Sequence, residues 1–500
     1  MIGGAAVEAA LRDGRGVPLA GKIVRGHYVD SIALMRIADE TRRLPGVHSA
    51  TLVLATAANQ QALRDAGLWP FTSDTAGADD LVIAVTGENE AAVRAALERT
   101  EAALTRRPGA VGPTGVLPAR SIIGAVRRAP GANLAVIAAP GRYAVAEAQQ
   151  ALSAGLHAFI FSDGVGLDDE ARLKRRACER GLLVMGPECG TAIVNGVGLG
   201  FANAVRGGSV GLVGASGTGL QEVSTLLHRL GAGVSHALGT GGRDLQSAVG
   251  GVSTLQALAL LGGDPRTRVV VIVSKPADDA VASVVLESAA ALGKPVVVCL
   301  LGWRGKVPAG VRAVASLEEA AVAAMAALDL EPRPLPEPDM RPRRRFGRGS
   351  VHGFYTGGTL CEEARALVGA AAGPFVDFGA AQYTEGRPHP MIDPQRRDRA
   401  LAESGDDPTA SVLLFDIVLG QCAHPDPAGA AVGGIEEARV RAKRGGRHFD
   451  VVAHVVGTED DPQRLSAQER MLREHDVIVC PSNRRAALMA RNLAGGSDAG

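Results

Sequence analysis

A glycine-rich turn near the middle of the chain, set between an apolar strand and an amphipathic helix, constrains the possible folds most. Residues 210–213 form a short apolar and β-branched run, which is typical of a buried parallel strand. From residue 220 apolar side chains recur at helical spacing as far as residue 230, and Gly231 supplies a stop. The turn between strand and helix predicts a phosphate-binding site made of Gly214, Ser216, Gly217, Thr218 and Gly219.

Such a turn suits an anion because the first N–H groups of a helix are unpaired and lie at the positive end of its dipole. The hydroxyl groups of Ser216 and Thr218 would add donors. The turn is not a Walker A loop, since no Gly-Lys-Ser/Thr closes it, and it lacks the spacing of the dinucleotide fingerprint. An ordinary tight turn between strand and helix is the alternative interpretation.

Composition limits the classes of protein that fit the chain. Its 500 residues suggest roughly three domains, and 46% apolar residues supply their cores. Lys plus Arg and Asp plus Glu both number 53, which argues against a binder of nucleic acid or of membrane surfaces. No apolar run is long enough for a membrane span, and we expect no signal peptide. Six scattered cysteines favour reduced thiols in a cytoplasmic protein, and we predict no metal site.

The first 120 residues read as a small α/β domain. Strand-like runs at 51–55 and 81–85 lie between helical runs at 32–43 and 88–104. Asp30 or Ser31 is a candidate cap for the first helix. Residues 106–120 contain three prolines and three glycines, which is typical of a linker.

Residues 121–207 alternate between strand and helix, with strands at 134–138, 158–161 and 182–185. This order predicts a Rossmann-like parallel sheet with ligand-binding loops at the carboxyl ends of its strands. Any one loop by itself is better explained by ordinary turn residues, but three such loops at one sheet edge favour a cleft. The candidate cofactor-binding residues in these loops are Ser162, Gly186, Pro187 and Glu188.

Residues 208–330 repeat the alternation and form the next predicted domain, again with a parallel sheet. A second glycine-rich loop follows the strand at 233–238 and adds the candidates Gly241, Gly242, Arg243 and Asp244. Arg243 and Asp244 suit an ion pair with each other, although an arginine also binds carboxylate or phosphate in a bidentate manner. The fold class is therefore α/β, with several Rossmann- or flavodoxin-like parallel-sheet domains in tandem.

A break rich in proline and arginine at 331–350 predicts a stiff, solvated linker, with an acidic partner as the alternative. Residues 351–500 form a last α/β domain, and a third glycine turn lies at 353–360. Three prolines stiffen the loop at 386–394, which presents Arg387 and His389 as candidate catalytic residues, with Asp393 beside them. A rigid loop with a locally bonded histidine is the alternative.

The chain resembles the FdrA family of acyl-CoA synthetases, which is related to the succinyl-CoA ligase alpha subunit. Six segments carry the resemblance: 28–35 (YVDSIALM), 186–190 (GPECG), 210–222 (VGLVGASGTGLQE), 241–244 (GGRD), 354–359 and 386–394 (GRPHPMIDP). The resemblance implies a CoA-binding domain at 121–207, a ligase-like domain at 208–330 and a ligase-like domain at 351–500. It also implies CoA as the cofactor and the 216–218 turn as the place of the transferred phosphate.

Two departures from the ligase pattern bear on the activity. The ligases carry a phosphorylated histidine in a Gly-His-Ala-Gly motif, whereas residues 302–305 read GWRG, and no histidine lies between His236 and His352. The ligases also have a glutamate at the end of the preceding strand, whereas this strand ends in Ser274-Lys275-Pro276. We therefore expect the phosphohistidine relay to be absent.

The resemblance and these departures together predict a subunit that acts on an acyl-phosphate-type intermediate. Its expected partners are an acyl phosphate or carbamoyl phosphate, a small carboxylate substrate and companion subunits. One alternative is a subunit of an oxamate carbamoyltransferase in purine (allantoin) breakdown. The other is a scaffold subunit without catalysis.

Overall fold

The computed structural model describes residues 7–12, 17–26, 29, 31–71, 76–77, 80–105, 119–338, 349–384 and 387–495. The chain forms two compact units. The first comprises Met1–Arg120 with Ala381–Pro388, and the second comprises Ser121–Ala380 with His389–Gly500. The candidate cap Asp30 and most of the two predicted linkers, at 106–118 and 339–348, lie outside the described residues.

The first unit is built on an antiparallel sheet with the strand order β1-β2-β4-β3. Its central strand β4 is buried along its whole length, because neighbours flank it and helices cover it. The core of this unit gathers apolar side chains such as Leu34, Leu52, Ile83 and Leu97. The elements are β1 (Val7–Arg12), β2 (Pro18–Val24), α1 (Ser31–Arg42), β3 (Val47–Leu54), α2 (Ala57–Asp65), β4 (Leu81–Gly87) and α3 (Glu90–Thr105).

The second unit begins with a three-stranded parallel sheet, as the alternation of strands and helices predicts. Apolar side chains from strands and helices, among them Leu152, Ile160 and Leu173, form its core. The elements are α4 (Ile122–Arg128), β5 (Leu134–Ile137), α5 (Gly141–Ser153), β6 (His157–Ile160), α6 (Leu167–Glu179) and β7 (Val184–Met185).

A seven-stranded sheet follows, with the strand order β14-β13-β12-β10-β11-β8-β9. Five of its strands are parallel, and the hairpin of β8 and β9 adds antiparallel strands beside β11. The strands are β8 (Thr191–Val194), β9 (Val197–Gly200), β10 (Gly207–Ala215), β11 (Val234–Gly239), β12 (Val269–Ser274), β13 (Val296–Leu300) and β14 (Val311–Ala313). The helices are α7 (Gly217–Leu230), α8 (Val252–Gly263), α9 (Asp279–Ala290) and α10 (Leu317–Ala326).

The last sheet is parallel throughout and has the order β16-β15-β17-β18-β19. Its strands are β15 (Ser350–Tyr355), β16 (Ala372–Asp377), β17 (Ala410–Val418), β18 (Asp450–Val456) and β19 (Ile478–Cys480). The helices from the same part of the chain are α11 (Gly358–Val368), η1 (Gly369–Ala371), α12 (Ala381–Thr384), α13 (Gln395–Ser404), α14 (Pro427–Arg444), α15 (Leu465–Glu474) and α16 (Asn483–Leu493). These parallel sheets confirm the predicted fold class.

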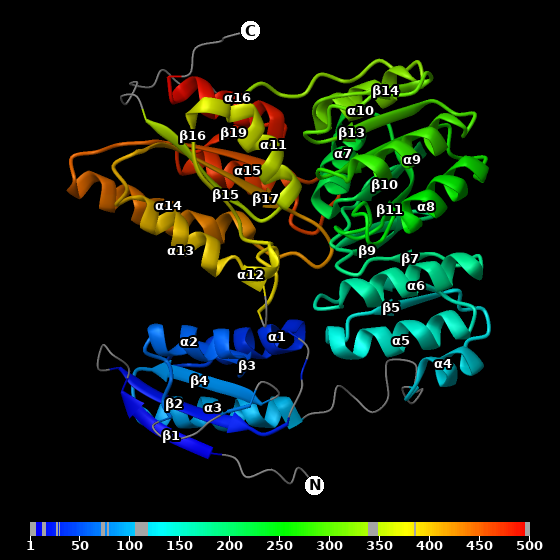
Figure 1. Ribbon diagram of the computed structural model, residues 1–500. Helices are drawn as coiled ribbons and strands as arrows, with labels where there is room; N and C mark the ends of the chain where they lie inside the picture. Colours follow the sequence, from blue (N-terminus) through cyan, green and yellow to red (C-terminus); the bar gives the residue numbers. More distant parts are fainter. Residues whose placement is uncertain are drawn as a thin grey trace. The chain divides into compact units, whose positions relative to one another are not determined.

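The parallel strands β10 to β14 and the strands β15 to β19 repeat one topology. Numbered within its own half, each sheet has the order fifth, fourth, third, first, second. Each half begins with the residues Gly-Ser-Val, at 208–210 and 349–351, and each first strand leads into a glycine turn and a helix. Figure 1 shows the two halves, with α7 and α11 following the first strand of each. The equivalent helices α7 and α11 are therefore central to both halves.

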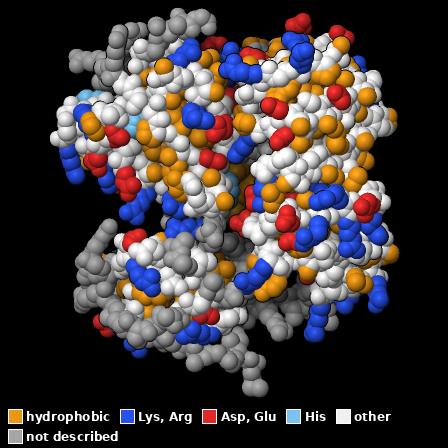
Figure 2. All heavy atoms as spheres, viewed as in Figure 1, with side chains coloured by type: hydrophobic (Ala, Val, Ile, Leu, Met, Phe, Trp, Pro, Cys, Tyr) orange, Lys and Arg blue, Asp and Glu red, His pale blue; other side chains and the backbone are white. Residues whose placement is uncertain are grey.

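Charged side chains are mixed on the protein surface. On the face drawn in Figure 2, Lys and Arg are interspersed with Asp and Glu. This mixture agrees with 53 basic and 53 acidic residues in the sequence.

Candidate functional site

The predicted phosphate turn is the start of α7. Ser216 caps the helix, and its Oγ accepts a hydrogen bond from the Gly219 N–H at 2.9 Å. In the described part of the chain, no acceptor faces the N–H groups of Gly217 and Thr218. A side chain at Gly214 would collide with the carbonyl of Val273, so only glycine allows the strand to approach this closely. The turn therefore offers two backbone donors at the positive end of α7.

The start of α11 lies against the start of α7. The hydroxyl groups of Ser216 and Thr359 are hydrogen-bonded at 2.5 Å. A Cβ on Gly357 would lie 2.8 Å from the side chain of Thr218. Gly357 caps α11 without a side-chain hydrogen bond. The N-termini of two helices thus meet at one point, and the positive ends of their dipoles lie together there.

Asp416 fixes the turn before α11. One of its carboxylate oxygens accepts from the Thr356 N–H at 2.7 Å and from the Thr356 hydroxyl at 2.9 Å, while the other accepts from the Gly357 N–H at 2.9 Å. Complete burial raises the pKa of Asp416 to about 6, against the effect of these hydrogen bonds. The carboxylate orients the backbone that leads into α11.

Lys275 and Asp377 stand beside this meeting point. Lys275 follows β12, Asp377 ends β16, and Nζ lies 3.8 Å from Oδ2. A Cβ on Gly358, the first residue of α11, would collide with both side chains. The Lys275 side chain is 41% exposed and that of Asp377 is 21% exposed, so solvent reaches them. Burial raises the pKa of Asp377, and the Lys275 ammonium opposes that rise.

The loop at 186–191 reaches the start of α7. The Glu188 N–H donates to the carbonyl of Ser162 at 3.0 Å, and a Cβ on Gly241 would collide with the carbonyl of Pro187. Thr191 is 1% exposed, and its hydroxyl has no hydrogen-bond partner among the described residues. A Cβ on Gly217 would lie 3.7 Å from that hydroxyl. The loop therefore adds a buried donor near the first turn of α7.

Arg243 and Asp244 do not pair with each other, in contrast to one sequence-based interpretation. Asp244 Oδ1 lies 2.8 Å from the Lys174 ammonium, and Arg243 lies 2.9 Å from Glu170. Lys174 and Glu170 belong to α6 and are completely buried, so each side chain of the loop reaches toward α6 rather than toward its neighbour. These contacts join the 241–244 loop to the preceding sheet.

His389 lies at the same sheet edge as Asp377. Its Nδ1 accepts from the Met391 N–H at 3.2 Å, so the proton of the neutral ring is on Nε2. Burial lowers the pKa of His389 to about 4. A Cβ on Gly379 would lie 2.8 Å from His389 Nε2 and 3.1 Å from Asp377 Oδ1. The ring also stacks obliquely on Phe201, with centroids 5.4 Å apart.

Arg387 belongs to the first unit and His389 to the second. The assignment of Arg387 to catalysis stays a prediction. Gly386, at the start of the same predicted loop, lies outside the described residues.

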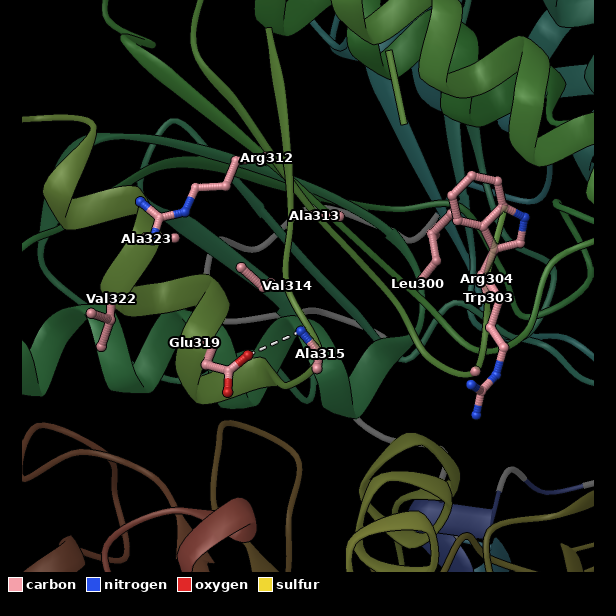
Figure 3. Close-up of a pocket in the computed structure, with 11 residues that line it drawn as sticks. Leu300, Trp303, Arg304, Arg312, Ala313, Val314, Ala315, Glu319, Val322 and Ala323 are labelled. Carbon is pink, nitrogen blue, oxygen red and sulfur yellow. Dashed lines mark hydrogen bonds between the residues drawn. The ribbon is translucent and has the colours of Figure 1, made fainter. Parts of the chain in front are cut away.

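The GWRG segment at 302–305 lines a pocket of about 700 Å³. Figure 3 shows its residues on the loop after β13, on β14 and on α10, with Glu319 bonded to the Ala315 N–H at 3.0 Å. The side chain of Trp303 packs partly against the core of the sheet. The segment therefore contributes an indole ring, Trp303, and a guanidinium, Arg304, to this pocket.

In the part of the chain that the structure describes, no helix has the length and apolar character of a membrane span. Among the same residues, no three His, Cys, Asp or Glu side chains gather around a common metal position.

Three family models match the chain. The model described as CoA-ligase matches residues 354–493, and the model described as CoA binding domain matches residues 206–302. The CoA binding domain model therefore matches the part of the chain, 208–330, for which the resemblance implied a ligase-like domain. The model described as AllF, heavy metal-associated domain, matches residues 18–114. No cysteine occurs in that range, so its residues do not fit a thiolate site for a soft metal.

A relative spanning nearly the whole chain decides the family. The uncharacterized protein YahF of Escherichia coli is 39% identical over 502 residues, covering 93% of this chain and 96% of YahF. The chain belongs to the FdrA family. This confirms the resemblance seen in its motifs.

More distant relatives match parts of the FdrA chain. The succinate–CoA ligase [ADP-forming] subunit alpha 2 of Archaeoglobus fulgidus is 31% identical over 159 residues, covering 31% of this chain and 54% of that subunit. A dinucleotide-forming acetyl-coenzyme A synthetase 1 of Ca. Korarchaeum cryptofilum aligns with 78% of this chain and 88% of its own, at 18% identity and a TM-score of 0.37. The match to the CoA-ligase model and the identity with the Archaeoglobus subunit show that the FdrA chain is a CoA-ligase-like protein related to succinyl-CoA ligase alpha subunits.

Proposed function

We propose that this FdrA chain is an acyl-CoA synthetase-like subunit that binds the phosphate of an acyl phosphate between the starts of α7 and α11. The observation that carries this proposal is the meeting of the two helix N-termini, joined by the Ser216–Thr359 hydrogen bond. Lys275 and the unpartnered Thr191 hydroxyl add a cation and a donor to the backbone N–H groups. Such a donor set stabilises a phosphate leaving group.

The phosphate reaches this site on the substrate rather than on a histidine. The GWRG segment offers no imidazole, and Lys275 replaces a carboxylate that would steady one. An ammonium beside two helix N-termini attracts a phosphate dianion. This positive group supports an acyl phosphate as the substrate.

CoA is the first candidate for the acyl acceptor. The family matches support a CoA-binding role for the chain. The loop residues Ser162, Gly186, Pro187 and Glu188 are the proposed contacts, because they line the approach to the start of α7. Companion subunits would complete the site, and the cytoplasm remains the predicted location.

Carbamoyl transfer to a small amide acid such as oxamate is the second candidate function. The lack of a histidine in the GWRG segment favours it, because carbamoyl phosphate already carries its activated phosphate. A scaffold subunit without catalysis would keep the fold but would not need Lys275 at the helix starts.

Calorimetric titration of Ser216→Asp tests the phosphate site. Aspartate caps a helix as well as serine does, so we expect the variant to stay folded. Its negative charge should weaken binding of carbamoyl phosphate or acetyl phosphate at least about tenfold, which is about 1.4 kcal/mol. Ser283→Asp, on the exposed face of α9, is the control and should bind as the wild type does.

Two further titrations decide between the acceptors. CoA binding that is lost on substitution of Glu188 would favour acyl-CoA formation. Carbamoyl phosphate binding without CoA binding would favour carbamoyl transfer. If neither acyl phosphate binds, even with companion subunits present, the proposed phosphate site is wrong.

A further inference from the structure

We propose, building on the proposed function, that Asp377 is the general base that takes the proton of the acyl acceptor. Its carboxylate would receive this proton as the acceptor attacks the acyl carbon of the bound acyl phosphate. The inference rests on where the carboxylate stands, on which of its oxygens is already bonded and on what surrounds it.

One oxygen of Asp377 is fixed and the other faces the site. Oδ1 accepts from the Gly379 N–H at 2.9 Å, while Oδ2 faces the Lys275 ammonium at 3.8 Å. Both side chains pack on Gly358, the first residue of α11, which belongs to the proposed phosphate cradle. The base is therefore held in a defined orientation beside the place of the leaving phosphate.

Binding of the substrate would itself strengthen the base. A phosphate dianion at the helix starts competes with Asp377 for Lys275, because both anions lie within reach of one ammonium. The charged or titratable groups that act on Asp377 are Lys275 on the loop after β12, Glu362 and Cys361 on α11, and His389 near Gly379. Burial and Glu362 raise the pKa of Asp377, so it titrates closer to neutral pH than an exposed aspartate does.

The other acidic groups near the site are already committed. Asp416 is completely buried and accepts three hydrogen bonds from Thr356 and Gly357. Glu188 lies 3.9 Å from the Arg243 guanidinium, which also pairs with Glu170. Among the acidic residues that the structure describes, Asp377 combines partial solvent exposure with contact to the first residue of α11.

The proposed step is balanced without any redox partner. The S–H or N–H bond of the acceptor breaks, and its proton moves to Asp377 Oδ2. The sulfur or nitrogen forms a bond to the acyl carbon, and the carbon–oxygen bond to phosphate breaks. Phosphate leaves with that electron pair, and the N–H groups of both helices with Lys275 stabilise its charge.

Turnover of Asp377→Asn and Asp377→Glu tests the inference. The full chain, with its companion subunits, is given acetyl phosphate or carbamoyl phosphate, with CoA or oxamate as the acceptor, between pH 5 and pH 9. We expect Asp377→Asn to bind the acyl phosphate within about threefold of the wild type but to lose turnover about a hundredfold or more. Its rate should also lose the fall toward acid pH, and Asp377→Glu should restore part of the rate.

Asp460→Asn, at a side chain 68% exposed, is the matched control and should keep the wild-type profile. Wild-type turnover with an unchanged acid limb in Asp377→Asn would overturn the inference. Loss of acyl-phosphate binding in that variant would also overturn it, because Asp377 would then serve binding rather than proton transfer. If the wild-type protein binds acyl phosphate but transfers no acyl group, the role of Asp377 as a general base is wrong, whereas the phosphate site is still supported. A wild-type protein that binds none refutes the proposed function itself.

Discussion

The ammonium of Lys275 lies 3.8 Å from Asp377 and packs on the first residue of α11. At the scale of the residue, this ammonium favours an anionic partner beside the start of α11.

Lys275→Met is expected to raise the Kd for acetyl phosphate or carbamoyl phosphate at least about tenfold, because a charge-assisted hydrogen bond contributes about 1.5–3 kcal/mol. Calorimetric titration measures the change. Lys275→Arg should keep most of the affinity, and Lys306→Met, at an exposed lysine, should leave it unaltered. Equal affinity in Lys275→Met and the wild type would rule out a phosphate at this lysine.

At the scale of the element, α7 and α11 each cap a helix of the other half. Glu222 of α7 accepts from the Asn483 N–H at the start of α16, at 3.1 Å. Glu363 of α11 accepts from the Leu317 N–H at the start of α10, at 2.7 Å. Glu222 and Glu363 stand at equivalent places in the two repeated helices. These reciprocal caps hold the two helix starts against each other.

Glu363 also makes this contact between the two halves sensitive to pH. Burial raises its pKa from 4.5 to about 7. Between these values the folded state holds a proton that the unfolded state has lost, so the free energy of unfolding falls as pH rises from 4.5 to 7. The Leu317 N–H and the Asn483 Nδ2 group donate to the two carboxylate oxygens and oppose this rise in pKa.

Glu363→Gln imitates the protonated carboxyl and should therefore flatten this part of the pH dependence. Urea unfolding at pH 6 and pH 8 measures the effect, and the variant should be more stable than the wild type at pH 8. Glu362→Gln, at an exposed position of the same helix, should retain the wild-type slope. A Glu363→Gln variant with the wild-type slope would assign the pH dependence to other groups.

At the scale of the whole molecule, the two units have separate cores. Ile83 lies in the core of the first unit and Ile272 in that of the second. Each core can lose its packing without direct loss of the other, so more than one unfolding transition is expected.

Differential scanning calorimetry of Ile83→Ala tests this expectation. Removal of a buried isoleucine side chain costs about 2–5 kcal/mol, so one transition should move to lower temperature while the other stays. Ile272→Ala should move the other transition. A single transition that both variants shift equally would show that the two units unfold as one.

Much of the second unit could be predicted from local patterns. The alternation of apolar strands and helices indicated parallel sheets, and α7 ends at Gly231 as predicted. The first unit was harder, because its sheet is antiparallel and β2 lies beside β4, distant in sequence. Strand pairing depends on contacts between distant segments, which periodicity does not encode.

The sequence by itself determined the family, the parallel sheets and the glycine turn at the start of α7, since each depends on residues close together in the chain. Only the tertiary structure brought α11 to that turn and joined Thr359 to Ser216. The tertiary structure also places the Thr191 hydroxyl near the first turn of α7 and the Asp377 carboxylate beside Lys275. These residues meet because strands from separate halves end near one another, and that juxtaposition arises from packing between the halves rather than from any local pattern.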